Sequence, residues 1–307
     1  MSTTEASLFA LIDGFLLPGA LAVMMFGIGL NLQARDFRRV LSSRTAFVRG
    51  MVSMLLLVPA AGIALALAFG PTPELTLGLV LLATCPGGLL SNAMTDFADG
   101  DVALSVCLST GSSIAYMISL PLVLAALTVG ELVPGIAVPL PYAASLSAII
   151  LFTALPIAMG MMARRTLPNF ARAARDEIRR YATFALVLML AVVIYRERDA
   201  LLVEMGPLLA TIFAMNLVNV LIATLMSIGP RLNAQERIAI VMEHLIRQEG
   251  TAIFVAVSVI GLPAAAIPMI LNTLVGMFAS LLFVSLIRIR KYGARSSDLA
   301  VRTSLGQ

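Results

Sequence analysis

Long apolar segments separated by short polar links run along the whole chain. Most of them approach or exceed the roughly 20 apolar residues that a helix needs to cross a bilayer. The pattern predicts nine spanning helices, at residues 8–31, 46–69, 75–97, 102–127, 142–163, 179–195, 207–229, 236–260 and 264–288. No link is long enough for a soluble domain. We therefore expect an all-α polytopic membrane protein with a single membrane transporter domain over residues 1–307 and a short tail at 289–307.

The third apolar segment carries helix breakers at its centre. It contains TCPGGLLSN, residues 84–92, whose breakers are Pro86, Gly87 and Gly88. Backbone groups freed by such a break cost several kcal/mol in hydrocarbon unless protein or trapped water satisfies them. We therefore expect the break to line a site, with the polar residues Ser91 and Asn92 next to it.

The eighth apolar segment is interrupted by charged residues. It contains EHLIRQEG, residues 243–250, which ends at Gly250. Charged groups at membrane depth are costly and usually face a cavity, a partner or an ion pathway. Segments three and eight run in opposite directions, and paired discontinuous helices are typical of transporters built from inverted repeats. We expect repeats at about 8–127 and 142–288, whose broken helices cross near the midplane.

The composition agrees with a membrane protein, and the charges give its orientation. Hydrophobic residues make up 60% of the 307 residues and charged residues only 12%. Of the 21 Lys and Arg residues, 17 lie in the tail and in the links after predicted helices 1, 5 and 7. Cytoplasmic loops carry an excess of basic residues. This places the N-terminus outside and the C-terminus in the cytoplasm, in the cell's inner (plasma) membrane. The net charge of +4 reflects this topology and does not indicate nucleic-acid binding.

The polar residues do not form the ligand set of an intramembrane enzyme. A metalloprotease needs a pattern such as H-E-x-x-H, whereas the single histidine, His244, stands alone in EHLIRQEG. We therefore predict no enzymatic activity and no resident cofactor. For His244 two readings stay open, a packed and hydrogen-bonded side chain or a group that couples transport to protons.

Two stretches resemble the bile acid:sodium symporter family and its bacterial relatives. They are GFLLPGALAVMMFGIGLNLQARDF, residues 14–37, and TCPGGLLSNAMTDFADGDVALSVCLST, residues 84–110. The resemblance implies a nine-helix form with a panel domain and a core domain, in which the broken helices cross. It also implies transport of a small organic anion, bile-acid-like or a monocarboxylate, coupled to sodium by alternating access.

The resemblance implies one complete sodium site. Its five ligands correspond to Ser91, Asn92, Ser105, Ser109 and Glu243. This set is chemically sensible, because a hard cation prefers several oxygen ligands and one carboxylate offsets its charge. Two alternatives stay open. Small polar residues also pack helices together in membranes, and Glu243 is four residues from Arg247, a spacing that suits an ion pair on a helix.

The family's second sodium site is not matched. Two positions where family members often have Gln are Met54, ahead of Pro59, and Arg247. A thioether is a poor sodium ligand and a guanidinium has only donors, so we predict that this site is missing. Two roles stay open for the group formed by Met54, Arg247 and Gln248. Arg247 replaces the second ion with a fixed positive charge, or it meets the carboxylate of the substrate.

The leading function is therefore a sodium-coupled transporter of a small organic anion that uses one sodium site. The alternative is proton-coupled or uncoupled transport, in which a Glu243–Arg247 pair replaces sodium. The expected partners are the organic anion, sodium and the lipid bilayer, with no nucleic acid. The pattern does not select the anion or the oligomeric state.

Three other polar residues in or near the apolar segments have structural interpretations. Arg49 is expected to snorkel at the cytoplasmic end of the second helix. Asp101 is expected to cap the start of the fourth. Cys85 is expected to be a buried thiol in preference to a metalloid ligand.

Overall fold

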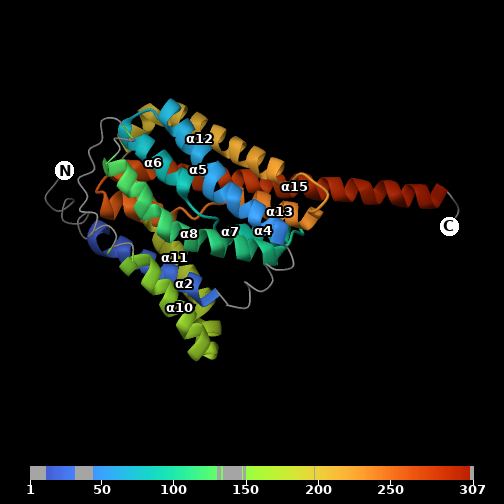
Figure 1. The fold of residues 1–307 in the computed structure, drawn as a ribbon, viewed down its shortest axis with the longest axis horizontal. Coiled ribbons are helices and arrows are strands. Elements are labelled where there is room, and N and C mark those ends of the chain that lie inside the picture. Colours follow the sequence, from blue (N-terminus) through green and yellow to red (C-terminus); the bar gives the residue numbers. More distant parts are fainter. Residues whose placement is uncertain are drawn as a thin grey trace.

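The computed structural model describes residues 12–31, 44–129, 133, 147, 150–196 and 198–304. These residues form helices joined by short turns, and no strand occurs among them (Figure 1). The elements in chain order are η1 (Ile12–Leu16), α2 (Leu17–Asn31), α4 (Arg44–Val52), η2 (Ser53–Leu57), α5 (Val58–Phe69), α6 (Pro73–Thr84), α7 (Leu89–Phe97), α8 (Val102–Val129), η3 (Ile150–Ala154), α10 (Leu155–Thr166), α11 (Pro168–Arg196), α12 (Arg198–Ser227), α13 (Ala234–Leu245), α14 (Gly250–Phe254), η4 (Val255–Val259), η5 (Pro263–Ala266) and α15 (Ile267–Ser304). The elements η1 to η4 are π-helical turns, and η5 is a 3-10 turn.

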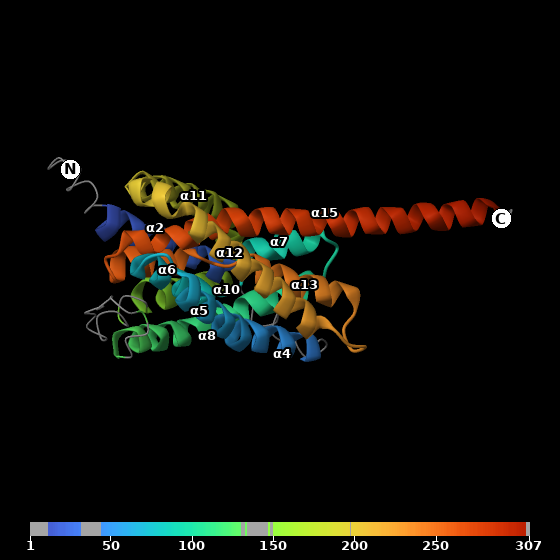
Figure 2. The same ribbon diagram turned by 90° about the horizontal axis from the view of Figure 1, so that it is seen from above.

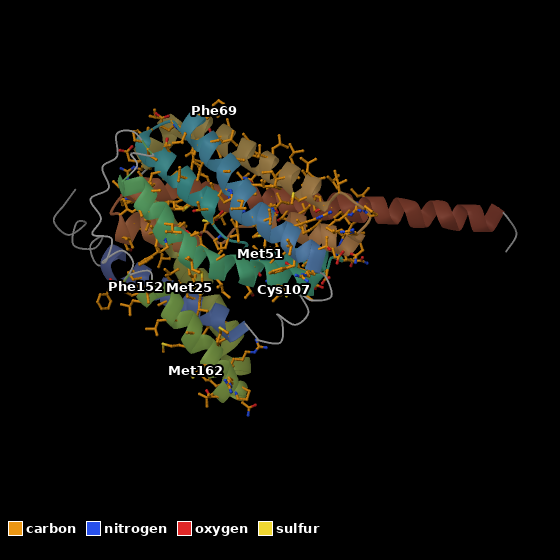
Figure 3. The ribbon with its side chains drawn as sticks, viewed as in Figure 1. Met25, Met51, Phe69, Cys107, Phe152 and Met162 are labelled. Carbon is orange, nitrogen blue, oxygen red and sulfur yellow. The ribbon has the colours of Figure 1, made fainter. Side chains whose placement is uncertain are left out.

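Several helices have the length and the surface of membrane spans. Within the described ranges, four helical stretches are long and apolar enough to cross a bilayer: Arg44–Phe69, Val102–Ala126, Val203–Ser227 and Pro263–Ile289. Large apolar side chains lie at the periphery of the bundle and point outward, among them Phe69 and Met162 (Figure 3). Such outward apolar surface fits lipid better than water. The total of nine spans stays a prediction.

Some helices extend beyond the apolar segments that predict them. Helix α11 begins at Pro168, where the pattern predicts a start at 179, and α12 begins at Arg198 instead of 207. Helix α15 continues to Ser304, past the predicted end at 288, and extends beyond the rest of the bundle (Figure 2). The apolar pattern marks only the part of a helix that suits lipid. Ala, Arg and Glu continue the helix because they are strong helix formers.

Parts of the predicted topology lie outside the described residues. They include the predicted start of the first helix at 8–11 and the basic residues of the link that follows it, Arg35, Arg38 and Arg39.

Helix α2 forms a group with α10 and α11, on one side of the molecule (Figure 1). Two glycines allow α2 and α10 to approach closely. A Cβ on Gly29 would lie 2.2 Å from the carbonyl oxygen of Ile157, and one on Gly160 would lie 2.2 Å from that of Phe26. Small residues at the contact are typical of helices that pack in membranes. The remaining helices pack around α5, α6, α12 and α13.

The two predicted helix breaks are confirmed, and their extended segments lie side by side. Helix α6 ends before Pro86 and α7 begins after Gly88, while α13 ends before Arg247. The N–H of Gly88 donates to the carbonyl oxygen of Ile246 at 3.0 Å, and that of Gln248 donates to Pro86 at 2.8 Å. The two segments therefore pair as an antiparallel bridge, and we call this pair of segments the crossing. The freed backbone groups find partners in each other, as a low-dielectric interior requires.

Candidate functional site

A buried carboxylate lies at the centre of the site. Glu243 is on α13, two residues before its end, and has no exposed surface. Its Oε1 lies 2.5 Å from the hydroxyl of Ser91 on α7 and 2.5 Å from the hydroxyl of Ser105 on α8. Three elements that are far apart in the sequence therefore meet at one carboxylate oxygen.

The other two predicted ligands complete this cluster. The hydroxyl of Ser105 lies 2.8 Å from Oδ1 of Asn92, and Nδ2 of Asn92 lies 3.5 Å from the hydroxyl of Ser109. Ser109 donates back to the carbonyl oxygen of Ser105, one helical turn earlier, at 3.1 Å. The five residues predicted as sodium ligands are thus brought together. We call them the oxygen cluster.

The oxygen cluster contains more acceptors than its hydroxyl protons can satisfy. Ser91 Oγ is within hydrogen-bonding distance of both Gly88 O and Glu243 Oε1, although a hydroxyl carries one proton. Ser105 Oγ likewise faces both Asn92 Oδ1 and Glu243 Oε1. Each hydroxyl can donate to only one of its two neighbouring oxygens. The other close contact therefore joins two oxygens with no hydroxyl proton between them. A small hard cation satisfies such an arrangement, so the residues present fit sodium.

Thr95 lies next to the oxygen cluster, and the sequence analysis missed it. It is fully buried on α7, and its hydroxyl donates to Ser105 Oγ at 3.2 Å. A signal for it was available, because Thr95 follows Ser91 by four residues. On a helix this spacing places both side chains on one face.

Local signals in the sequence fix the helix ends that carry the cluster. Asn233 and Glu236 form a capping box that starts α13. Asp101 caps α8, as expected, since its carboxylate accepts from the N–H of Leu104 at 3.0 Å. The N–H of Asp101 also donates to the carbonyl oxygen of Gln235 at 3.0 Å. The short turn between α7 and α8 is therefore tied to the start of α13.

Arg247 does not pair with Glu243. Among the described residues, no ion pair joins Arg247 to a carboxylate within 4.0 Å. The expectation of a pair at a spacing of four residues is wrong, because α13 ends at Leu245 and Arg247 follows in extended backbone. Arg247 is 7% exposed and donates from Nη2 to the carbonyl oxygen of Ala83 at 3.1 Å. Its Nε and Nη1 are buried without a hydrogen-bond partner.

The other residues of the predicted second site lie against the crossing or face α2. Met54 is buried, and a Cβ on Gly87 would lie 2.9 Å from its Cε. Gln248 lies with its Nε2 3.7 Å from the sulfur of Met25 on α2. A Cβ on Gly250 would lie 2.4 Å from Cε of Met24. The second break therefore contacts α2, the helix that packs with α10 and α11.

A second buried carboxylate ties the crossing to other helices, and the sequence analysis missed its role. Oε1 of Glu249 accepts from Nδ2 of Asn272 at 2.5 Å, and the hydroxyl of Thr273 donates to its other oxygen. Oδ1 of Asn272 in turn accepts from Nδ2 of Asn216 on α12 at 2.7 Å. Amides within apolar segments were the available signal, since polar groups at membrane depth need partners.

The remaining polar residues have structural roles. His244 is buried, with Nδ1 2.7 Å from the carbonyl oxygen of Ile240 and Nε2 2.9 Å from the hydroxyl of Ser53, which agrees with the packed reading. Arg49 donates to the carbonyl oxygen of Ile228, beyond the end of α12, at 2.9 Å.

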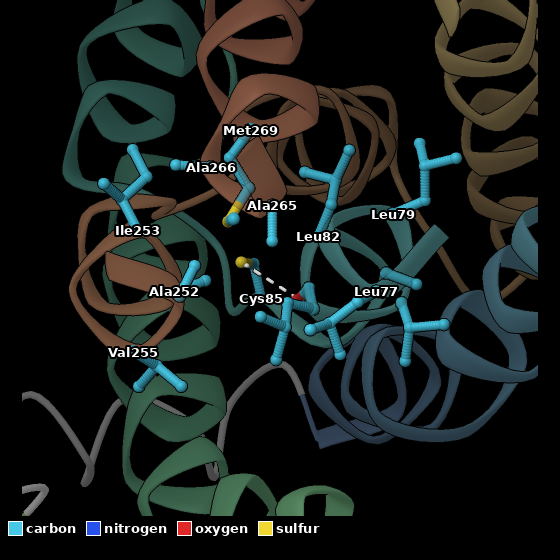
Figure 4. Close-up of a cluster of buried hydrophobic side chains, with 14 of the residues drawn as sticks. Leu77, Leu79, Leu82, Cys85, Ala252, Ile253, Val255, Ala265, Ala266 and Met269 are labelled. Atoms are coloured by element: carbon cyan, nitrogen blue, oxygen red, sulfur yellow. Dashed lines mark hydrogen bonds between the residues drawn. The ribbon is translucent and has the colours of Figure 1, made fainter. Parts of the chain in front are cut away.

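Cys85 is a buried thiol, as expected. It lies among apolar side chains of α6, α14 and α15, and a dashed line in Figure 4 marks its contact with a backbone carbonyl. That carbonyl belongs to Leu81, at 3.4 Å. Within the described residues no group of acidic, histidine and cysteine side chains forms a transition-metal site.

Comparison with known proteins shows that the chain is similar to transporters. The model of the sodium bile acid symporter family matches residues 18–204. A probable chloroplastic sodium/metabolite cotransporter of Oryza sativa is 36% identical over 150 residues, which cover 49% of this chain and 34% of the relative. An uncharacterized sodium-dependent transporter of Bacillus subtilis is 35% identical over 104 residues, 34% of this chain and 32% of the relative. The ileal sodium/bile acid cotransporter of Cricetulus griseus is 30% identical over 152 residues, 50% and 43% of the two chains. The chain spans less than half the length of each of these relatives.

Proposed function

Because the chain belongs to the sodium bile acid symporter family, we propose that it transports a small organic anion together with sodium. This family consists of membrane transporters and not of enzymes. The observation that supports the proposal most strongly is the oxygen cluster, with its single buried carboxylate and its excess of acceptors over protons.

In the proposed mechanism, sodium binds between three elements that carry the two breaks. Ser91 and Asn92 come from α7, Ser105 and Ser109 from α8, and Glu243 from α13. A cation at this position pulls the three elements together and places a positive charge beside the crossing. That charge lowers the cost of bringing an anion to the same region, and binding free energies of two ligands are coupled reciprocally. Alternating access then moves both ligands across the membrane.

The proposal includes only one sodium ion. The second family site has Met54 and Arg247 in place of oxygen ligands, and the guanidinium of Arg247 is held in the crossing by Ala83. A fixed positive charge there repels a second cation. In this proposal one sodium ion is bound and transported, and the guanidinium of Arg247 provides a second positive charge that stays with the protein.

We propose an architecture of nine helices in two inverted repeats, at about 8–127 and 142–288. Helices α2, α10 and α11 form the panel, and the other helices form the core with the crossing near the midplane. The N-terminus lies outside, while the tail at 289–307 lies in the cytoplasm, because the links assigned to that side hold most basic residues.

The test is the thermal stability of the purified protein against sodium concentration, with potassium holding the ionic strength constant. A ligand that binds only the folded state at 100 times its Kd adds about 2.7 kcal/mol. We expect a saturable, one-site rise that potassium does not produce and that Glu243→Gln abolishes. The matched control is Glu177→Gln, which changes an exposed carboxylate and leaves the rise intact.

Equal melting curves in sodium and potassium would contradict the proposal. Coupling would then involve protons or no ion at all, and transport measured against pH would decide between them.

A further inference from the structure

A second group of buried polar atoms lies at the crossing and takes no part in the oxygen cluster. It consists of Nε and Nη1 of Arg247 and the hydroxyl of Tyr116, none of which has a hydrogen-bond partner in the described structure. We propose that Arg247 and Tyr116 together bind the carboxylate of a small monocarboxylate, the transported anion. This inference rests on the proposed transport function and names the substrate class and its anchor.

The guanidinium of Arg247 retains a complete pair of donors. An arginine has five N–H groups, and Ala83 uses one of the two on Nη2. The second N–H of Nη2 lies parallel to an N–H of either Nε or Nη1. These two parallel donors form one edge of the guanidinium that has no acceptor. Such an edge matches the two oxygens of a carboxylate. A buried charge without a partner is costly, so the site favours a ligand that supplies the missing acceptors.

Tyr116 provides a third donor from a different helix. It is 4% exposed on α8 and belongs to the same buried cluster as Cys85 and Ala83, whose carbonyl oxygen accepts from Arg247. A buried tyrosine hydroxyl usually has a partner. A carboxylate oxygen held by Arg247 has a further lone pair that can accept from this O–H.

Helix α8 connects the proposed anion site to the oxygen cluster. Ser105, Ser109, Ser112 and Tyr116 follow each other at spacings of three or four residues, which places them on one helical face. Ser112 accepts from the N–H of Gly87 at 3.2 Å, so this face runs along the first break. Tyr116 follows Ser109 by seven residues, a rise of roughly 10 Å along the helix. A sodium ion and a carboxylate at this separation attract each other through a poorly screened interior.

The surroundings select a small ligand. Ala83, Cys85 and Tyr116 belong to the buried apolar cluster between α6, α8 and α14, and each is less than 5% exposed. A cationic edge beside buried apolar side chains suits a carboxylate on a short alkyl chain better than a large polar anion.

The experiment measures the thermal stability of the full chain in saturating sodium, against acetate and propionate, with chloride holding the ionic strength constant. We expect a saturable rise with either carboxylate. Tyr116→Phe removes the hydroxyl donor and raises the apparent Kd for the carboxylate about tenfold. Arg247→Lys keeps the charge, loses the two-pronged edge and weakens it at least about tenfold. Tyr181→Phe and Arg49→Lys are matched controls away from the crossing and leave the Kd unchanged.

The same variants are titrated with sodium, so that the two proposals can fail separately. A sodium effect retained in Tyr116→Phe together with a weakened carboxylate effect supports the inference. Two results would show that the anion site is wrong while sodium coupling stands. In the first, sodium raises the melting temperature but carboxylates raise it no more than chloride does. In the second, Tyr116→Phe binds carboxylates with the wild-type Kd. If neither sodium nor carboxylate stabilises the wild type, both proposals are wrong. Should Arg247→Lys fail to fold, the near-isosteric Tyr116→Phe still decides.

Discussion

At the scale of single residues, the absence of a side chain matters as much as the ligands. Gly87 lies in the first extended segment, where a Cβ would come within 1.9 Å of Oε2 of Glu243. That distance is far below van der Waals contact. The glycine therefore allows the carboxylate of one broken helix to lie against the backbone of the other.

Replacing this glycine should disrupt the oxygen cluster. In Gly87→Ala the added methyl group displaces the carboxylate of Glu243, so we expect the sodium-dependent rise in melting temperature to disappear. Gly206→Ala is the control, because nothing lies within 4 Å of its new methyl group. In the interior of α12 it should stabilise the protein by about 0.5–1 kcal/mol. A sodium response of normal size in Gly87→Ala would rule out this role of the glycine.

Thr95 is expected to position a ligand without binding the ion itself. Its hydroxyl donates to Ser105, which in turn faces Glu243. Thr95→Val preserves shape and removes a hydrogen bond of about 1 kcal/mol, which corresponds to roughly fivefold weaker sodium binding. Sodium titration of the melting temperature measures this, and the exposed Thr166→Val should bind sodium normally. An unchanged sodium Kd would show that Thr95 only packs.

At the scale of elements, the two breaks support each other. Each extended segment supplies backbone partners for the other, through Gly88 with Ile246 and Gln248 with Pro86. Neither break would be stable alone in an apolar interior, because its freed groups would lack partners. The helix that carries Glu243 is fixed at its far end by the capping box of Asn233.

Removing this cap should lower stability and leave the ion site intact. Asn233→Ala deletes the oxygen that accepts from the N–H of Glu236 at 2.8 Å. We expect a loss of about 1 kcal/mol in the free energy of unfolding. The sodium Kd should stay within a factor of about two, because the cap lies more than two turns from Glu243. A large loss of sodium affinity would instead show that the cap sets the position of the carboxylate.

At the scale of the whole molecule, the proposed sodium and carboxylate sites determine the net charge of the ligands that we expect to be transported. One sodium and one monocarboxylate carry no net charge together, while Arg247 remains part of the protein. Helix α2, which packs with α10 and α11, contacts the second break through Met24 and Met25, so a movement of this group relative to the other helices would change that contact. The alternating access that we propose requires such a movement.

Transport should therefore be insensitive to membrane potential. One net charge would change the equilibrium accumulation about 50-fold per 100 mV. We expect sodium-driven accumulation of a labelled short-chain carboxylate in proteoliposomes to be the same with and without an imposed potassium diffusion potential. Accumulation that follows the potential with a slope of one charge would indicate a second transported sodium.

The sequence by itself determined the class of protein and the positions of both breaks, while the five members of the oxygen cluster were predicted from the resemblance to the family. The class and the breaks depend on local chemistry, since apolar length and helix breakers can be read along one segment. Only the tertiary structure showed that Arg247 donates to the carbonyl oxygen of Ala83 and does not pair with Glu243. It also showed that Thr95 contacts Ser105 and that the hydroxyl of Tyr116 is buried without a partner. The physical reason is that partners on different helices are chosen by packing. A spacing rule for a continuous helix fails where that helix ends.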